Sequence, residues 1–245
     1  HRSFIGFDNF KKIFNSKYLL PTLSLTFRYT AFTLFLKLSL GFITALFLNS
    51  DMYFSKVLKF LTLLPWAMQQ VAVAVVWKWI FDGNYGYLNF YLQKIGLLHE
   101  NISFLSNPTT AFFAASFVDA WLGIPMVAMI FISGLSNINL SLYESAKIDG
   151  AGVFMRFIHI TCPCIKRVFF VTLTLVGIWT FNSFNVIFVL TGGGPMRSTE
   201  TLMLKIYEEA FSKFDLSVAY ALSCLVVGIL FIFTFIYCSM NKEDT

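Results

Sequence analysis

Long apolar segments alternate with shorter polar ones along most of the chain. Five of them reach the ~20 residues that a helix needs to cross the hydrocarbon core of a bilayer. They lie at residues 22–48, 58–81, 109–135, 168–190 and 216–239. A helix satisfies its own backbone hydrogen bonds, which lipid does not do. The pattern predicts an all-α integral membrane protein with five transmembrane helices, kinked where Pro65 and Pro125 fall inside a segment.

Composition supports a membrane protein. Hydrophobic residues make up 57% of the 245 residues and charged residues 13%, against about 25% charged in soluble domains. The net charge of +5 does not indicate nucleic acid, because Lys and Arg at membrane borders explain it. The four cysteines contain one close pair with no matching second pair, so no metal site is expected.

One segment, from Asn139 to Pro163, interrupts this pattern with a long mixture of polar and apolar residues. Asn139 or Ser141 can cap a short helix through Ile148, and Gly150 can end it. A second amphipathic turn follows, and we expect Pro163 to stop it before the next apolar segment. The alternative is that this segment is only a connecting helix at the membrane interface, with no function of its own.

The same segment resembles the EAA loop of ABC importer permeases. The matching residues are Glu144, Ser145, Ala146, Asp149, Gly150 and Ala151, followed by Phe157, Ile160 and Pro163. In that family the loop is cytoplasmic and forms a coupling helix that docks in a cleft of the ATPase subunit. The resemblance implies that the first six of these residues couple the chain to an ATPase.

Two further stretches resemble sugar permeases of this family. They are W-K-W-I-F-D-G-N-Y-G-Y-L-N at residues 77–89 and F-N-V-I-F-V-L-T-G-G-G-P-M-R-S-T-E-T-L at 184–202, with I-Y-E-E-A-F at 206–211. Gly193, Gly194 and Pro195 are the structural signature of the second stretch. Glycine there permits a tight turn and a close approach of backbone to another element. An ordinary loop after a helix is the alternative.

Together these motifs identify the chain as similar to permeases of the binding-protein-dependent sugar transport family, of maltose, multiple-sugar or glycerol-phosphate type. The resemblance implies a type I ABC importer transmembrane domain at residues 22–240, after an extracytoplasmic lead-in at 1–21. It places the cytoplasmic coupling loop at 136–166 and one more helix before residue 1. The implied function is a transmembrane path for a sugar, in particular an oligosaccharide, in a bacterial cell membrane.

The resemblance also implies partners. These are a second homologous permease in a heterodimer, two ATPase subunits, and an extracytoplasmic sugar-binding protein that delivers the substrate. The sequence contains no G-x-x-x-x-G-K-[ST] pattern, so ATP binding through a P-loop is not expected. We therefore expect no catalytic residue or cofactor in this chain, with ATP and Mg bound by the partner ATPase subunits.

Polar residues inside the apolar segments are candidates for the path, because lipid disfavours them. Amides, hydroxyls and aromatic rings suit a neutral sugar. Asn182 and Asn185 are expected to share one helix face, and so are Tyr220 and Ser223. The full set is Gln69, Gln70, Trp179, Asn182, Asn185, Tyr220 and Ser223. For each residue taken singly the alternative is an interhelical hydrogen bond, worth about 0.6 kcal/mol.

The first apolar segment carries a stripe of small and polar residues at three- and four-residue steps, which we expect to face the bundle interior or a partner. The stripe consists of Thr26, Thr30, Thr33, Lys37, Gly41 and Thr44. Lys37 lies near the middle of the segment, where an exposed cation costs about 2.5–3.5 kcal/mol. The alternative to a Lys37 that faces the bundle interior or a partner is a side chain that snorkels, with its charged end at the membrane interface.

Two other transporter types remain as alternatives. A glycerol-phosphate permease of the same family would favour Arg in the path, and Arg28 is the only Arg inside an apolar segment. A proton-coupled secondary transporter would also place Asp119 and Lys37 in the membrane. It would, however, show inverted repeats and broken half-helices, and the sequence indicates neither.

The topology can be tested by labelling. With residues 139–163 inside, alternation places 82–108 and 192–215 outside, although Lys and Arg divide almost evenly between the two sides. A Cys introduced at Asn84 or Ser198 should then react with an impermeant maleimide added to intact cells. A Cys at Lys147 should react only after permeabilisation. The reverse pattern would overturn this topology.

Overall fold

Every regular element that the computed structural model describes, over residues 6–49 and 55–240, is helical. Four helical stretches in this part are long and apolar enough to cross a membrane: Leu19–Leu48, Pro108–Ser136, Val153–Leu190 and Leu216–Tyr237. A fifth span is possible if the bent pair Ser55–Ala67 and Gln70–Ile80 counts as one. The predicted all-helical membrane fold is confirmed, with four or five spans.

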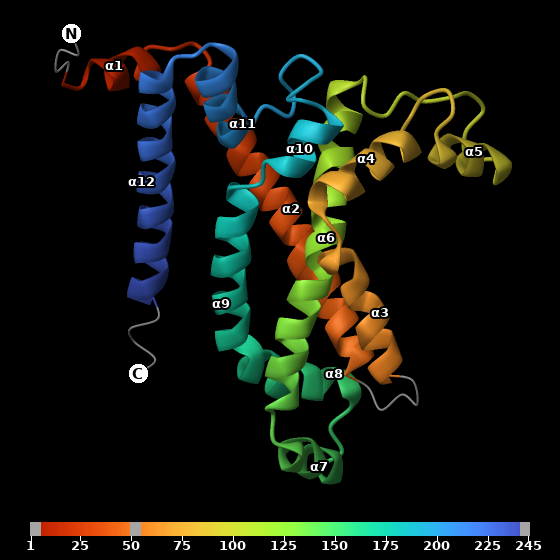
Figure 1. The fold of residues 1–245 in the computed structure, drawn as a ribbon. Helices are drawn as coiled ribbons and strands as arrows, with labels where there is room; N and C mark the ends of the chain where they lie inside the picture. Colours follow the sequence, from red (N-terminus) through yellow and green to blue (C-terminus); the bar gives the residue numbers. More distant parts are fainter. Residues whose placement is uncertain (1–5, 50–54, 241–245) are drawn as a thin grey trace. The chain divides into compact units, whose positions relative to one another are not determined.

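The helices follow one another as Figure 1 labels them. They are α1 (Asp8–Phe14), α2 (Leu19–Leu48), α3 (Ser55–Ala67), α4 (Gln70–Ile80), α5 (Tyr87–Lys94), α6 (Pro108–Ser136), α7 (Leu140–Ile148), α8 (Val153–Arg156), α9 (Cys162–Phe181), α10 (Asn185–Leu190), α11 (Leu202–Tyr207) and α12 (Leu216–Met240). Two π-helical segments, η1 (Phe157–Thr161) and η2 (Glu208–Ser212), follow α8 and α11. The chain forms two compact units: the first lies within residues 1–32, 70–119 and 178–245, and the second within 33–69 and 120–177.

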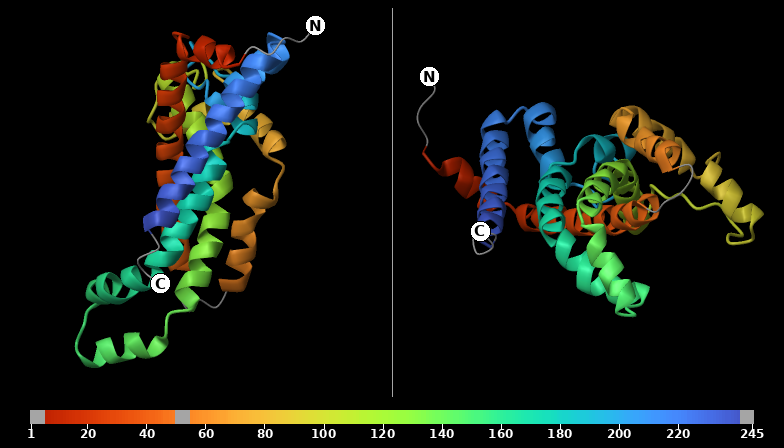
Figure 2. Two further views of the ribbon diagram at one scale, coloured as in Figure 1. Left: turned by 90° about the vertical axis from the view of Figure 1, so that its left-hand side faces the viewer. Right: turned by 90° about the horizontal axis from the view of Figure 1, so that it is seen from below.

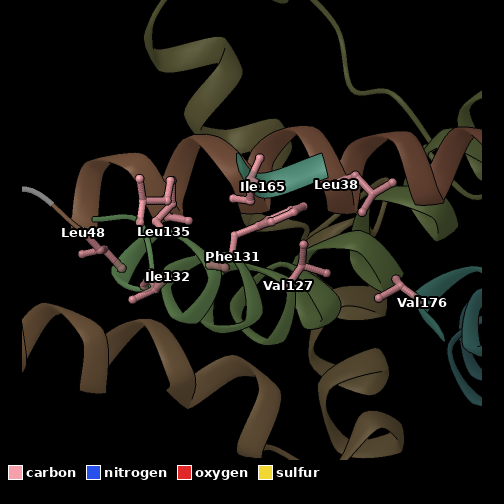
Figure 3. Close-up of a cluster of buried hydrophobic side chains, with 11 residues drawn as sticks. Leu38, Leu48, Val127, Phe131, Ile132, Leu135, Ile165 and Val176 are labelled. Carbon is pink, nitrogen blue, oxygen red and sulfur yellow. The ribbon is translucent and has the colours of Figure 1, made fainter. Parts of the chain in front are cut away.

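The second unit is organised around Phe131 of α6, which is fully buried. Its ring meets Phe42 of α2 edge-on, with centroids 5.1 Å apart, and stacks on Phe169 of α9 at 6.3 Å. Figure 3 shows Phe131 amid the aliphatic side chains that close this core. They include Leu38, Leu48, Val127, Ile132, Leu135, Ile165 and Val176. Close packing of three helices therefore fixes the base from which the loop at 139–163 extends.

The stripe on α2 is buried along much of its length, as expected. In the second unit Thr33 and Gly41 are buried, and Lys37 is only 5% exposed. The methylene chain of Lys37 packs on Gly123 of α6, where an added Cβ would lie 2.7 Å from the lysine Cε. Snorkelling is therefore the wrong explanation for Lys37, since its side chain turns into the protein and does not reach the surface.

The first unit has its own apolar core and a buried hydrogen bond to α2. The core brings α1, α2, α11 and α12 together through Ile13, Leu19, Phe181, Leu202, Val218, Ala221, Leu222 and Val226. Thr26 of the α2 stripe accepts a hydrogen bond from the Leu202 N–H at 2.9 Å. This bond satisfies a free N–H in the first turn of α11, which is one reason for a threonine at this position.

Two of the predicted spans are broken. The second predicted span, 58–81, is not one helix: α3 ends at Ala67 and α4 begins at Gln70, with a bend of 90° between them. Pro65 lies two residues before the end of α3, but the hydrogen bond that it lacks would run back to the Leu61 carbonyl, so Pro65 alone does not account for the break. The fourth predicted span is also interrupted, because α9 ends at Phe181 and α10 begins at Asn185. A mere kink at Pro65 and an unbroken helix over 168–190 are therefore wrong expectations.

The close contact of α2 with α6 allows a test of packing in the second unit. A Cβ at Gly41 would lie 2.6 Å from Val127 Cγ1, whereas a Cβ at Gly228 on α12 meets nothing within 4 Å. Gly41→Leu should lower the melting temperature, because overpacking costs about 1–3 kcal/mol. Gly228→Leu adds the same side chain and should leave melting nearly unchanged. Equal melting of both variants would contradict the close packing at Gly41.

Candidate functional site

The predicted coupling loop is a capped helix with a glycine end. The Asn139 side chain accepts a hydrogen bond from the Ser141 N–H at 3.0 Å and so caps α7. Gly150 takes a φ of +77°. The N–H of Gly150 bonds to the Lys147 carbonyl at 3.1 Å, and that of Ala151 bonds to the Ala146 carbonyl at 2.8 Å. This pair of bonds is a Schellman motif, in which a left-handed glycine ends the helix.

The residues expected to couple to an ATPase lie on a projecting surface. Glu144, Ser145, Asp149 and Gly150 are exposed, and Ala146 and Ala151 are half-buried. In the second unit, Figure 1 shows α7 beyond the lower ends of α6 and α9, with α8 level with those ends, and Figure 2 shows the loop projecting to the side of these helices. Large apolar side chains accompany them on the surface, with Ile148 87% and Phe154 75% exposed. Such an apolar patch with a charged rim is typical of a protein–protein contact site.

The loop is attached to the membrane helices by a continuous helical run. The hydroxyls of Tyr143 in α7 and Thr161 in η1 lie 2.9 Å apart. Segments α8, η1 and α9 follow one another without a gap from Val153 to Phe181, so the expectation that Pro163 stops the helix is wrong. In η1 the Cys162 N–H reaches the Phe157 carbonyl five residues back. This wider turn shifts the carbonyls that the proline ring would otherwise meet, so the helix passes through Pro163.

The residues that directly follow the breaks in the two interrupted spans are in contact through their side chains. Gln70 is the first residue of α4 and Asn185 the first of α10. The Asn185 Nδ2 donates a hydrogen bond to Gln70 Oε1 at 3.0 Å. Helix α10 packs on α4 in the first unit, and Val186 and Ile187 of α10 and Val73 and Ala74 of α4 are buried. Two of the predicted path residues, 115 positions apart in sequence, are thus one amide pair.

The other predicted path residues are not gathered at this pair. Asn182 lies in the break, where its Nδ2 donates to the Ile178 carbonyl at 2.8 Å, so it does not share a helix face with Asn185. Side-chain bonding to a terminal carbonyl competes with the next helical turn, which explains the end of α9 here. Tyr220 is exposed on α12, one turn from Ser223, whose hydroxyl donates to the Ala219 carbonyl. Trp179 is exposed on α9, and Gln69 is exposed in the break before α4.

The glycine signature forms a compact turn. Gly192 and Gly193 have φ values of +58° and +93°, and a Cβ on Gly193 would lie 2.7 Å from Leu204 Cδ2. Thr199 closes the turn: its hydroxyl donates to the Gly194 carbonyl at 2.9 Å and lies 2.7 Å from that of Thr191. Both the tight turn and the close backbone approach that the glycines predict are present.

The signature at 77–89 folds into a second turn. Asp82 accepts hydrogen bonds from the N–H groups of Asn84 and Tyr85 at 2.9 and 2.8 Å, which lowers its pKa. The buried Asn89 side chain bonds to Ile102 in both directions, donating to its carbonyl at 2.9 Å and accepting from its N–H at 3.1 Å. These bonds give Asp82 and Asn89 structural roles in the motif.

A network of charges that the sequence patterns do not predict follows the glycine turn. Lys205 is 8% exposed, donates to Glu208 at 2.8 Å and also contacts Glu209 at 3.2 Å. Burial raises the pKa of Glu208, but hydrogen bonds from Lys205 and Lys213 outweigh it and hold the pKa below its ordinary value. The hydrogen bond to Glu209 raises the pKa of Lys213. Only the helical spacing of these residues hints at such pairs.

Another feature missed by sequence reasoning is an aromatic cluster beside Asn185. Phe184 and Phe188 stack with centroids 5.1 Å apart. Tyr207 packs on Phe188 at 4.9 Å and on Phe211 at 4.9 Å. The cluster packs α10 against α11 and η2. This packing fixes the position of Asn185 relative to the glycine turn.

This fold and its loop belong to a known class of membrane protein. Residues 37–242 match the family described as "Binding-protein-dependent transport system inner membrane component". The chain belongs to this family, and the family resemblance of the EAA loop and the glycine signature is confirmed. It is therefore a multi-pass permease component of the plasma membrane.

Individual relatives cover nearly the whole chain. A probable ABC transporter permease protein of Brucella suis is 35% identical over 99% of this chain and 84% of its own length. The trehalose/maltose transport system permease protein of Thermococcus litoralis is 31% identical over 98% of this chain and 81% of its own. A bacterial ABC transporter "involved in the import of the acidic polysaccharide alginate" superposes with a TM-score of 0.90, at 22% identity, covering 100% of this chain and 86% of that one. At 22% identity, the similarity to the alginate transporter shows a shared fold and nothing more.

The amide pair can be tested as part of a sugar path. Asn185→Ala should weaken uptake several-fold, because each lost hydrogen bond to a neutral ligand costs roughly 0.5–1.5 kcal/mol. It should also change discrimination between two sugars, while ATP hydrolysis by the complex persists. Asn182→Ala should act similarly. Asn137→Ala, which removes an exposed amide of the other unit, is the control.

A purely structural amide pair gives a different result. The melting temperature of the complex would then fall by the same amount in Asn185→Ala, in Gln70→Ala and in the double variant, because each of them removes the same hydrogen bond. Sugar preference would stay as in the unmodified protein. That outcome would remove Asn182 and Asn185 from the path and leave Gln69 and Tyr220 to be tested.

Proposed function

We propose that this chain is the permease subunit of an ATP-driven importer and forms part of the transmembrane path for a sugar, in particular an oligosaccharide. The observation that carries the proposal is the capped α7 loop, with its exposed EAA residues, in a chain of this family. The name of the Thermococcus litoralis relative, a trehalose/maltose permease, supports a sugar as substrate. An extracytoplasmic binding protein would deliver it, as the family description implies.

The loop at 136–166 would transmit the state of the ATPases to the membrane helices. Glu144 and Asp149 supply negative charge, and Ile148 and Phe154 supply apolar surface for a cleft in an ATPase subunit. Because α8, η1 and α9 form one continuous helical run, a displacement of the loop would pass directly into the α9 span. ATP binding by the partners would bias the permease between inward- and outward-facing states.

The path would pass the amide pair of Gln70 and Asn185. Helix breaks within a membrane are stable only where protein or water surrounds the freed backbone groups. Such discontinuous helices often lie at the binding site of a transporter. The two amides expose donors and acceptors of the kind that sugar hydroxyls bind.

The rest of the assembly follows from the same proposal. A second homologous permease would complete the path as a heterodimer, and two ATPase subunits would bind ATP and Mg. This chain would contribute no catalytic residue. The limits 1–21 for an extracytoplasmic lead-in and 22–240 for the transmembrane domain remain predictions, and residues 1–5 lie outside the described part.

Unbroken helices do not distinguish this chain from a secondary transporter. Broken helices, which the sequence did not indicate, occur at residues 68–69 and 182–184. What distinguishes this chain from a secondary transporter is its membership of a family of binding-protein-dependent transport components. Glycerol phosphate remains a second candidate substrate within this family, to be compared with sugars in uptake measurements.

Coupling can be tested at two positions of the loop. Glu144→Lys reverses the charge offered to the ATPase, and Gly150→Asp places a side chain where φ is +77°, at a cost of about 1–2 kcal/mol. Both variants should reach the membrane, bind the partner permease and abolish sugar uptake. Gly152→Asp is the matched control, because Gly152 has a φ of −67° and open space around it.

Three measurements separate the possible outcomes. Immunoblotting of membranes measures expression, radiolabelled uptake measures transport, and affinity purification measures the ATPase that remains bound. Loss of uptake together with loss of ATPase binding or stimulation is expected for Glu144→Lys and Gly150→Asp but not for Gly152→Asp. Normal uptake in either loop variant would refute the assignment of the coupling helix.

A further inference from the structure

A groove of about 820 Å³ lies in the first unit, between the first turns of α2 and α6 and the end of the glycine turn. Aromatic and aliphatic side chains form most of its wall, including Leu25, Ala31, Phe32, Phe112 and Phe113. Two arginines, Arg28 and Arg197, line the same groove, and none of its lining residues is acidic. Positive charge and apolar surface are thus combined in one place.

Arg28 is an unusual residue for a membrane span. It lies nine residues after Leu19, about 14 Å along the axis of the apolar helix α2. Its side chain is exposed, and within residues 6–49 and 55–240 no carboxylate pairs with it. The hydrogen bond that its Nε donates to the Ser24 carbonyl is long, at 3.4 Å. An exposed cation inside a span is costly unless an anion or water meets it.

Arg197 is held in position at the mouth of the groove. Its guanidinium lies 4.1 Å from the centre of the Tyr18 ring, and its Nε lies 3.3 Å from Glu200 Oε2. Tyr18 and Ser198 also line the groove. A guanidinium fixed by a ring and a carboxylate loses little freedom when it binds a further anion.

Polar and apolar residues are ordered along the groove. Tyr18, Arg197 and Ser198 lie in segments outside the long helices, whereas Ala31 and Phe32 follow Arg28 one turn further into α2. Phe112 and Phe113 lie a turn into α6. Beyond Arg28 the part of α2 that lines the groove is hydrocarbon, whereas nearer the start of α2 polar residues alternate with apolar ones such as Pro21 and Leu25.

We propose that this groove binds an anionic phospholipid, with its phosphate at Arg28 and Arg197 and one acyl chain along Ala31, Phe32 and Phe113. Arginine is suited to phosphate because its planar fork binds two oxygens. A soluble anion would use the arginines but leave the apolar wall exposed. An apolar helix of another subunit would cover the wall but leave the Arg28 cation without an anion.

The test uses the purified transporter complex in nanodiscs and native mass spectrometry. Phosphatidylglycerol and phosphatidylcholine with identical acyl chains are the probes, and the unmodified complex should retain phosphatidylglycerol selectively. Arg28→Gln should weaken this binding about 5-fold, the amount expected for one basic residue at a lipid surface. Arg28→Lys should retain most of it. Ala31→Trp, which fills the groove and keeps both arginines, should also weaken binding.

Lys17→Gln is the matched control, because Lys17 is an exposed cation just before α2 that does not line the groove. It should bind phosphatidylglycerol as the unmodified complex does. Soluble sn-glycerol-3-phosphate, which offers the phosphate without acyl chains, should not displace the lipid.

Three results would overturn the proposal. One is equal retention of phosphatidylglycerol in all variants, which indicates annular lipid only. A second is displacement by sn-glycerol-3-phosphate, which indicates a site for a soluble anion. The third is weaker phosphatidylglycerol binding in Ala31→Trp with unchanged binding in Arg28→Gln, which indicates an uncharged occupant such as a helix of another subunit. If Arg28→Gln fails to assemble, Arg197→Gln removes the other cation of the groove and decides the question in its place.

Discussion

The constraint on which the rest of the structure depends is that backbone N–H and C=O groups find no partner in lipid. Long uninterrupted helices meet it along α2, α6 and α12. The helices are interrupted at residues 68–69 and 182–184, and polar side chains lie at both interruptions. Asn182 covers the Ile178 carbonyl at the end of α9, and Asn185 joins Gln70 where α10 and α4 begin. Interruptions of this kind are stable only where protein or water surrounds the freed backbone groups, as they would be along the proposed path.

Packing gives the loop at 139–163 a rigid base. Phe131 and its aliphatic neighbours join α2, α6 and α9 in the second unit, and Gly41 lets α2 approach α6 closely. Because α9 continues backward through η1 and α8, the loop is joined to this core by helix and not by flexible chain. A stiff connection of this kind is what a movement driven by partner ATPases would require.

The loop itself was predictable because its determinants are local. A cap at Asn139 and a left-handed glycine at position 150 depend on hydrogen bonds within a few residues, so the sequence pattern specifies them. The same holds for the tight turn at Gly192 and Gly193. Pro163 failed as a stop signal because the π turn before it depends on how the whole helix sits on its neighbours.

The sequence by itself determined the helical membrane class, the family, the approximate span limits and the capped loop. It did so because apolar length and cap chemistry are properties of short stretches. Tertiary structure alone decided three things: the pairing of Gln70 with Asn185 across 115 positions, the burial of Lys37 against Gly123, and the meeting of Arg28 and Arg197 in one groove. Each depends on which helices pack together, and an apolar segment that satisfies its own hydrogen bonds carries little information about its neighbours.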